Sequence, residues 1–188
     1  MDTPPEPPPS PEQIIEQRLV DCGLDAHGLS VRYEDGLQSL EIVIASSAGA
    51  TSKHFACIKE AAEHEIVTFE DGGMYSAYSK FTTELARPEM LAGSEKALKE
   101  AGLYEGFPER EAFETLEEYA VALEKHAGAN PGSALRVSGD GILFDPPRDA
   151  ASYADFEDRY SNLIAVVAYA SIRDRVGFGF IGNGAIAE

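Results

Sequence analysis

Hydrophobic residues near the start of the chain recur at the spacing of an α-helix. Ile15, Leu19 and Cys22 fall on one helical face, with polar residues between them. The Ser10-Pro11 pair before this pattern is favoured at a helix N-terminus. The pattern therefore predicts a helix that begins at residue 11 and ends at the glycine after Cys22.

Three later stretches also have helical spacing. The first runs from about residue 51 to 63, and the last from about residue 153 to 175. Because the last is apolar on most faces, we expect a long buried C-terminal helix there. The middle stretch, residues 74–127, is interrupted by residues that disfavour helices. The expected breaks are at Pro88, Gly93, Gly102 and Pro108.

Runs of β-branched and aromatic residues predict strands in three places. Asp35-Gly36 separates two such runs within residues 29–45, and Gly139-Asp140-Gly141 separates two more within residues 134–144. Short links of this kind are typical of β-hairpins. Residues 66–69 form a third, single run. Since hairpins dominate, the sequence predicts an α+β fold in which a small, mainly antiparallel sheet built from two hairpins is covered by helices.

The predicted domain organisation is a short arm followed by one domain. Residues 1–10 are rich in proline and have no core-forming pattern, which indicates a Pro-rich N-terminal arm. Residues 11–188 are few enough to share one core, so we expect a single α+β domain. Both halves contain a hairpin followed by a helix, but their turns lie at different offsets, and the pattern does not establish a repeat.

Charge is the least ordinary property of the sequence. Its 33 acidic and 15 basic residues give a formal net charge of −18. Such a surface repels phosphate groups, which disfavours direct nucleic-acid binding and favours a basic protein partner. The apolar run at residues 163–170 is shorter than the roughly 20 residues of a membrane span. With no secretory signal pattern at its start, the chain is expected in the cytoplasm, away from membranes.

The two cysteines receive different predictions. Cys22 lies on the apolar face of its helix and is expected to be a small buried hydrophobic residue. Cys57 shares the polar face of its helix with Lys53, Glu60 and His64, which makes it a candidate reactive thiol. A separation of about 10 Å along the helix excludes a catalytic pair of Cys57 with His64. Two cysteines are too few for a disulfide framework or a multi-cysteine zinc site, and no metal site is predicted.

A glycine motif near the end of the chain spells the fingerprint of dinucleotide-binding proteins. Gly177, Gly179 and Gly182 fit the pattern G-x-G-x-x-G. In that fold the glycines follow a strand and open a helix whose N-terminus receives the pyrophosphate. Here they follow a predicted helix, and few residues remain after them. We therefore expect a short strand or apolar tail, and we predict no cofactor.

Two groups of side chains are candidates for partner binding. Tyr75 and Tyr78, followed by Phe81, recur along one side of a predicted helix and combine aromatic surface with polar hydroxyls. The alternative interpretation is that these aromatic residues pack in the core. The second group lies on a predicted acidic helix. The alternative interpretation is that this helix face is simply exposed to solvent and binds no partner. The candidate contacts of this group are Glu114, Glu117 and Glu118.

Two classes of function fit these features. The first is a non-catalytic acidic protein-binding module of the chaperone, immunity, antitoxin or regulatory adaptor type, which engages a basic protein partner. The alternative is a small enzyme or small-ligand-binding protein with a pocket near the Tyr75/Tyr78 segment or the His54–His64 helix. The sequence contains no familiar catalytic motif, so the first class is preferred and no catalytic residue is assigned.

Overall fold

The structure is a computed structural model that describes residues 8–147 and 150–181. The chain folds into two compact units, unit 1 over residues 1–85 and unit 2 over residues 86–188. Each unit has its own cluster of buried hydrophobic residues. The chain thus has two cores where the sequence suggested one domain. The predicted arm lies mostly outside the described residues, which begin at Pro8.

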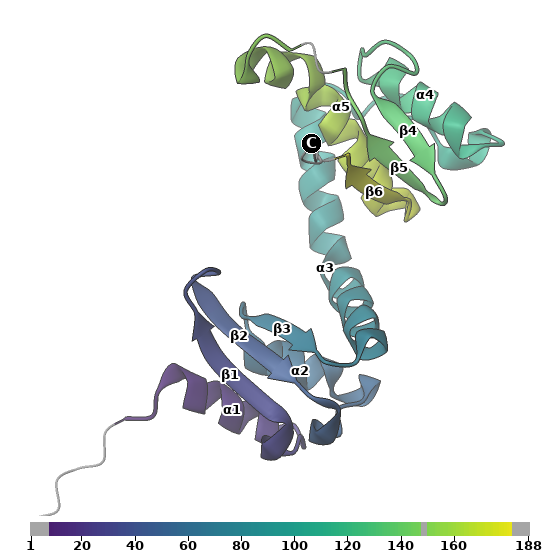
Figure 1. Cartoon of the computed structure of the whole chain (residues 1–188). Coiled ribbons are helices and arrows are strands. Elements are labelled where there is room, and N and C mark those ends of the chain that lie inside the picture. Colours follow the sequence, from purple (N-terminus) through teal and green to yellow (C-terminus); the bar gives the residue numbers. More distant parts are fainter. Residues whose placement is uncertain (1–7, 148–149, 182–188) are drawn as a thin grey trace, which may run out of the picture. The chain divides into compact units, whose positions relative to one another are not determined.

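Unit 1 contains two helices and a three-stranded sheet (Figure 1). Strands β1 and β2 form the predicted antiparallel hairpin, and β3 pairs with β2 in parallel. Short 3-10 turns precede β1 and α2. The elements are α1 (Pro11–Asp21), β1 (Leu29–Glu34), β2 (Ser39–Ile44), α2 (Phe55–Ala62) and β3 (Ile66–Phe69).

The core of unit 1 lies between its helices and one face of the sheet. Alternate residues of β2 (Leu40, Ile42 and Ile44) are buried together with Leu19 of α1 and Ile58 of α2. This period of two is what a strand buried on one face requires. Helix α1 starts as the sequence predicts, because Ser10 and the residue three positions later form a reciprocal capping box.

Helix α3 (Gly72–Glu100) is longer than the sequence suggests, since it continues through Pro88 and Gly93. The boundary between the two units falls inside this helix. Tyr78 near its start is buried in the core of unit 1, and Leu98 near its end is buried in the core of unit 2. Pro88 and Gly93 both lie at exposed positions within this helix, although each disfavours helical structure.

Unit 2 repeats the arrangement of unit 1 (Figure 1). Strands β4 and β5 form the second predicted hairpin, and β6 pairs with β5 in parallel. Helix α5 carries the buried residues Leu163, Val166 and Val167, as expected of a long buried C-terminal helix. The elements are α4 (Leu116–His126), β4 (Leu135–Ser138), β5 (Gly141–Phe144), α5 (Tyr153–Asp174) and β6 (Gly177–Phe180).

The α+β class predicted from the sequence is therefore confirmed, and both hairpins are present. The structure adds that the hairpins belong to two separate sheets, each completed by a parallel third strand. Both units follow the order helix, strand, strand, helix, strand with the same strand pairing. The shared hairpin-then-helix plan of the two halves is thus a shared topology.

The glycine motif lies on a strand, as expected, although Gly182 is outside the described residues. Gly177 and Gly179 belong to β6, and Gly141 of β5 lies opposite Gly177. A Cβ atom on Gly141 would lie 3.1 Å from the carbonyl oxygen of Gly177, which is tighter than ordinary packing. Helix α5 ends at Asp174, and its C-cap residue Arg175 has the left-handed conformation at φ 57°.

Candidate functional site

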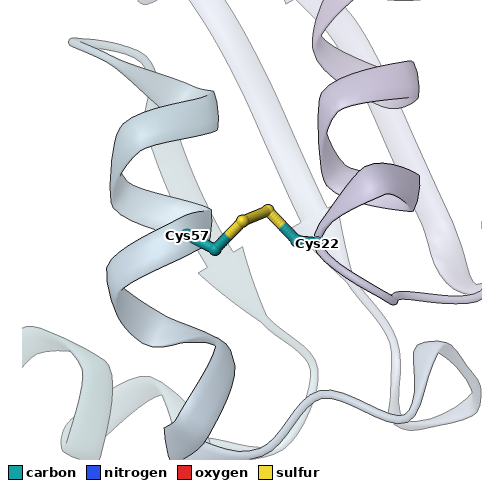
Figure 2. Close-up of a disulfide and its surroundings, with 2 residues drawn as sticks. All are labelled: Cys22 and Cys57. Atoms are coloured by element: carbon teal, nitrogen blue, oxygen red, sulfur yellow. A yellow bond between two sulfur atoms is a disulfide. The ribbon is translucent and has the colours of Figure 1, made fainter.

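Cys22 and Cys57 form a disulfide (Figure 2). Figure 2 shows the bond running from the C-terminal end of α1 to α2, where Cys57 lies in the first turn. The two Cα atoms are 5.8 Å apart, within the range that a disulfide requires. The prediction of a free reactive thiol at Cys57 is therefore wrong for this state of the protein, although its position on an exposed helix face is right.

The disulfide was missed because the sequence does not show which helices lie side by side. Cys22 is the C-cap residue of α1, past the buried face formed by Ile15 and Leu19, and it is only half-buried. A disulfide of this kind persists in oxidising compartments and is rare in the cytosol. The bond therefore does not support the expected cytoplasmic location.

Helix α2 and the turn before it present mainly charged and polar groups to solvent. Lys53, Glu60 and His64 are exposed, although only Glu60 lies within α2, since Lys53 belongs to the 3-10 turn before it and His64 follows its end. His54 accepts a hydrogen bond at its Nδ1 from the backbone N–H of Thr51, at 3.1 Å, and so caps the 3-10 turn. His54 therefore has a structural role, whereas Lys53, Glu60 and His64 remain on the surface.

The aromatic residues at the start of α3 divide between core and surface. Tyr78 is buried, with its ring 5.3 Å from the rings of Phe55 and Phe69, so the prediction that it contacts a partner is wrong. Burial also raises the pKa of its hydroxyl. Phe81 is half-buried against the same cluster. Tyr75 is 48% exposed and remains available for binding.

The acidic residues around α4 also divide into distinct roles. Glu118 caps the helix, because its carboxylate accepts hydrogen bonds from the backbone N–H groups of Glu114 and Thr115. Glu109 lies 3.4 Å from the guanidinium of Arg173. The exposed carboxylates of this region that form no interaction with another described residue are those of Glu111, Glu114 and Glu117.

Glu124 is wholly buried on α4, which the sequence pattern did not predict. One carboxylate oxygen accepts hydrogen bonds from the backbone N–H groups of Ala134 at 2.8 Å and Leu135 at 2.9 Å, and the other accepts from Gly132. Three backbone donors replace the water that a buried carboxylate loses. Glu124 therefore organises the loop before β4 and is not part of the exposed acidic surface.

A second polar network in unit 2 joins α4 to the end of α5. The hydroxyl of Tyr119 donates to Asp174 at 2.5 Å, and Asp174 accepts a further bond from Arg173 at 2.7 Å. Arg173 also lies over the ring of Phe107, at 4.8 Å from its centre. Burial and then the hydrogen bond to Asp174 raise the pKa of Tyr119. Because its donors are occupied by protein groups, we interpret this network as structural.

Three neighbouring depressions follow the surface of unit 1, with volumes of about 460, 270 and 390 Å³. The first is lined by the disulfide and Glu60, the second by Leu40 and His64, and the third by Tyr33 and His64. The first two are lined partly by α2, whereas the third is lined by the start of α1, the hairpin and the residues after α2. A further depression of about 370 Å³ in unit 2 is lined by Tyr104, Phe107, Tyr169 and Arg173.

Neither metal-site chemistry nor similarity to known proteins assigns a function. Within residues 8–147 and 150–181, no group of three or more His, Cys, Asp or Glu side chains is arranged to hold a metal ion. No helix in that part of the chain is both long and apolar enough to cross a membrane. No family model matches the chain, and no curated protein or solved structure matches it.

Proposed function

We propose that this protein is a non-catalytic binding module that engages a basic protein surface. The observation that carries the proposal is the set of exposed carboxylates at Glu111, Glu114 and Glu117, which have no described partner. Structural acids such as Glu118 and Glu124 are satisfied by backbone N–H groups, whereas these three are left to solvent. With a net charge of −18, they favour encounter with a basic partner.

Charge of this kind acts mainly on the rate of association. The attraction between exposed charges is screened over a Debye length of about 10 Å at 0.1 M salt and about 3 Å at 1 M. Affinity then depends on buried apolar or aromatic contacts. Of the two tyrosines predicted to bind a partner, Tyr75 and Tyr78, Tyr75 is exposed and can make such a contact.

The test uses a basic partner isolated from native extract and its association kinetics with purified variants. We expect Glu114→Lys with Glu117→Lys to slow association about tenfold or more at low salt, with little change in the dissociation rate. Glu118 stays unchanged, because its reversal would remove the helix cap. The control pair Glu157→Lys with Asp158→Lys changes the net charge equally on exposed positions of α5.

A smaller effect of the α5 pair would support the α4 surface as the site of encounter. Equal effects would mean that only net charge matters. If neither salt nor either pair of charge reversals changes the association rate, the acidic residues serve only solubility. That result would overturn the proposal.

A further inference from the structure

The three depressions of unit 1 join into one groove, which we call the α1–α2 groove. The first and second share Arg18, Ala61 and Glu63 in their lining, and the second and third share Leu40 and His64. The depressions therefore adjoin one another from the disulfide, along α1 and the C-terminal end of α2, to Tyr33 on the hairpin. Because neighbouring depressions share lining residues, we treat the three as one extended surface.

The floor of the α1–α2 groove is apolar. Ile15, Leu40, Ala61 and Ala62 line it and belong to the core of unit 1. Two large hydrophobic side chains remain exposed along it, Ile14 at 40% and Tyr33 at 54%. Exposed apolar residues that gather in a hollow, rather than singly, are characteristic of interaction surfaces.

The rim of the groove is acidic. Among the described residues that line it, the only Lys or Arg is Arg18, which forms an exposed ion pair with Glu63 at 2.6 Å. Ion pairs this exposed contribute little stability, about 0–1 kcal/mol, so a cation from another molecule can displace Arg18 at small cost. The carboxylates of the lining are those of Glu12, Asp21, Glu60 and Glu63, whereas that of Glu65 is part-buried and accepts hydrogen bonds from Ser39 and Leu40.

We propose that the α1–α2 groove binds a segment of the basic partner in which apolar side chains alternate with Lys or Arg. The apolar side chains of that segment enter the floor beside Ile14, and its cations meet Glu60 and Glu63 on the rim. This inference rests on the proposed function and supplies the apolar anchor that buried Tyr78 cannot provide. The Cys22–Cys57 disulfide holds α1 against α2, so the two walls are preset before binding.

The experiment uses the full oxidised chain and three short synthetic peptides, measured by fluorescence anisotropy at low and high salt. The first peptide alternates leucine with lysine, the second replaces lysine by glutamate, and the third replaces leucine by serine. We expect the leucine–lysine peptide to bind at least about tenfold more tightly than either of the others, because each of them lacks one half of the complementarity. Equal binding of the lysine–serine peptide would overturn the groove as an apolar anchor.

Paired variants locate the site. Ile14→Ser with Glu60→Lys removes one wall residue and one rim charge at exposed positions, and we expect it to weaken the leucine–lysine peptide about tenfold. Leu85→Ser with Glu70→Lys makes the same chemical changes at exposed positions outside the groove and should leave binding within about twofold of the wild type. NMR shifts of backbone amides should be confined to α1, α2 and the hairpin.

The outcomes separate the two proposals. If the leucine–lysine peptide binds but both variant pairs affect it equally, the groove is wrong and the proposed function stands. If the glutamate peptide binds as well as the lysine peptide, preference for a basic partner fails and both proposals fall.

Discussion

Units 1 and 2 have the same topology but are stabilised by different chemistry. Helices α1 and α4 each have 11 residues, and each begins with a reciprocal capping box. At the ninth position of each helix lies a wholly buried residue, which is Leu19 in α1 and Glu124 in α4. The C-cap residue is Cys22 in α1 and Ala127 in α4. One framework thus holds an apolar core residue and a disulfide in unit 1, and a buried carboxylate in unit 2.

The difference follows from the second helix of each unit. Helix α2 has 8 residues, whereas α5 has 22 and contributes a longer buried face. A short helix buries little apolar surface, and small cores commonly need a covalent link. We infer that the disulfide compensates for the short α2. Unit 2 has the longer α5 and no cysteine, and hydrogen bonds to Glu124 order its loop.

The largest expected effect comes from making α4 resemble α1 at its buried position. Glu124→Leu leaves the backbone N–H groups of Gly132, Ala134 and Leu135 without their acceptor, and each unsatisfied buried donor costs about 1–3 kcal/mol. We expect the free energy of unfolding of unit 2 to fall by about 3–5 kcal/mol. This loss of stability is measured by denaturant unfolding, together with hydrogen exchange followed on peptides from each unit.

Glu117→Leu on the exposed face of α4 is the control for that substitution and should change stability by less than about 0.5 kcal/mol. A Glu124→Leu variant as stable as the wild type would show that the carboxylate is dispensable and that both units accept an apolar residue there.

The disulfide should contribute slightly less. It closes a loop with a sequence separation of 35, for which the chain-entropy model gives about 3–4 kcal/mol. We expect Cys22→Ser with Cys57→Ser to lower the stability of unit 1 by that amount, while hydrogen exchange in unit 2 is unchanged. Thiol labelling of native protein from intact cells, without reductant, reports the state of the pair. Rapid labelling at Cys57 would mean that the bond is absent in the cell.

A third prediction concerns the residue just before the first strand of each unit. Gly28 and Ala134 hold this position, and both are buried. A Cβ atom on Gly28 would lie 2.6 Å from the Cα atom of Ala48, so the backbone has to move. Gly28→Ala should therefore destabilise unit 1 by about 1–3 kcal/mol, whereas Ala134→Gly should cost unit 2 about 1 kcal/mol through lost packing and added chain freedom. Equal losses would contradict this asymmetry.

The smallest effect is a dependence on alkaline pH. Burial raises the pKa of Tyr78 in unit 1, and burial together with Asp174 raises that of Tyr119 in unit 2. A raised pKa means that the folded state keeps a proton which the unfolded state loses near pH 10, so this stability is present below about pH 10 and falls above it. Each tyrosine contributes a loss of at most about 1.4 kcal/mol per pH unit.

Thermal unfolding of Tyr78→Phe and Tyr119→Phe between about pH 9 and 11 separates the two contributions around the free tyrosine pKa. Above about pH 10, stability should fall less steeply in Tyr119→Phe than in Tyr78→Phe. The reason is that Tyr119, unlike Tyr78, donates a hydrogen bond to a carboxylate. A larger flattening with Tyr78→Phe would reverse the assignment.

Local structure was largely determined by the sequence alone. The ends of α1, the strand at residues 66–69 and both hairpins follow from turn residues, capping pairs and apolar spacing, which act over a few positions. The α+β class follows from the order of those elements. The exposure of Glu117 follows in the same way, since a helical wheel needs only neighbouring residues. Glu114 is also exposed, but it lies before the N-cap Thr115 and not on the acidic helix where the sequence placed it.

Only the tertiary structure decided which of these elements share a core. The Cys22–Cys57 bond and the burial of Tyr78 depend on residues distant in sequence. The burial of Glu124 depends on the path of the loop that follows its helix. Helix α3 also continues through Pro88 and Gly93, where local propensity predicts a break. Local propensities differ by about 1–3 kcal/mol, and contacts between distant segments outweigh them, so a sequence read a few residues at a time cannot show where those contacts form.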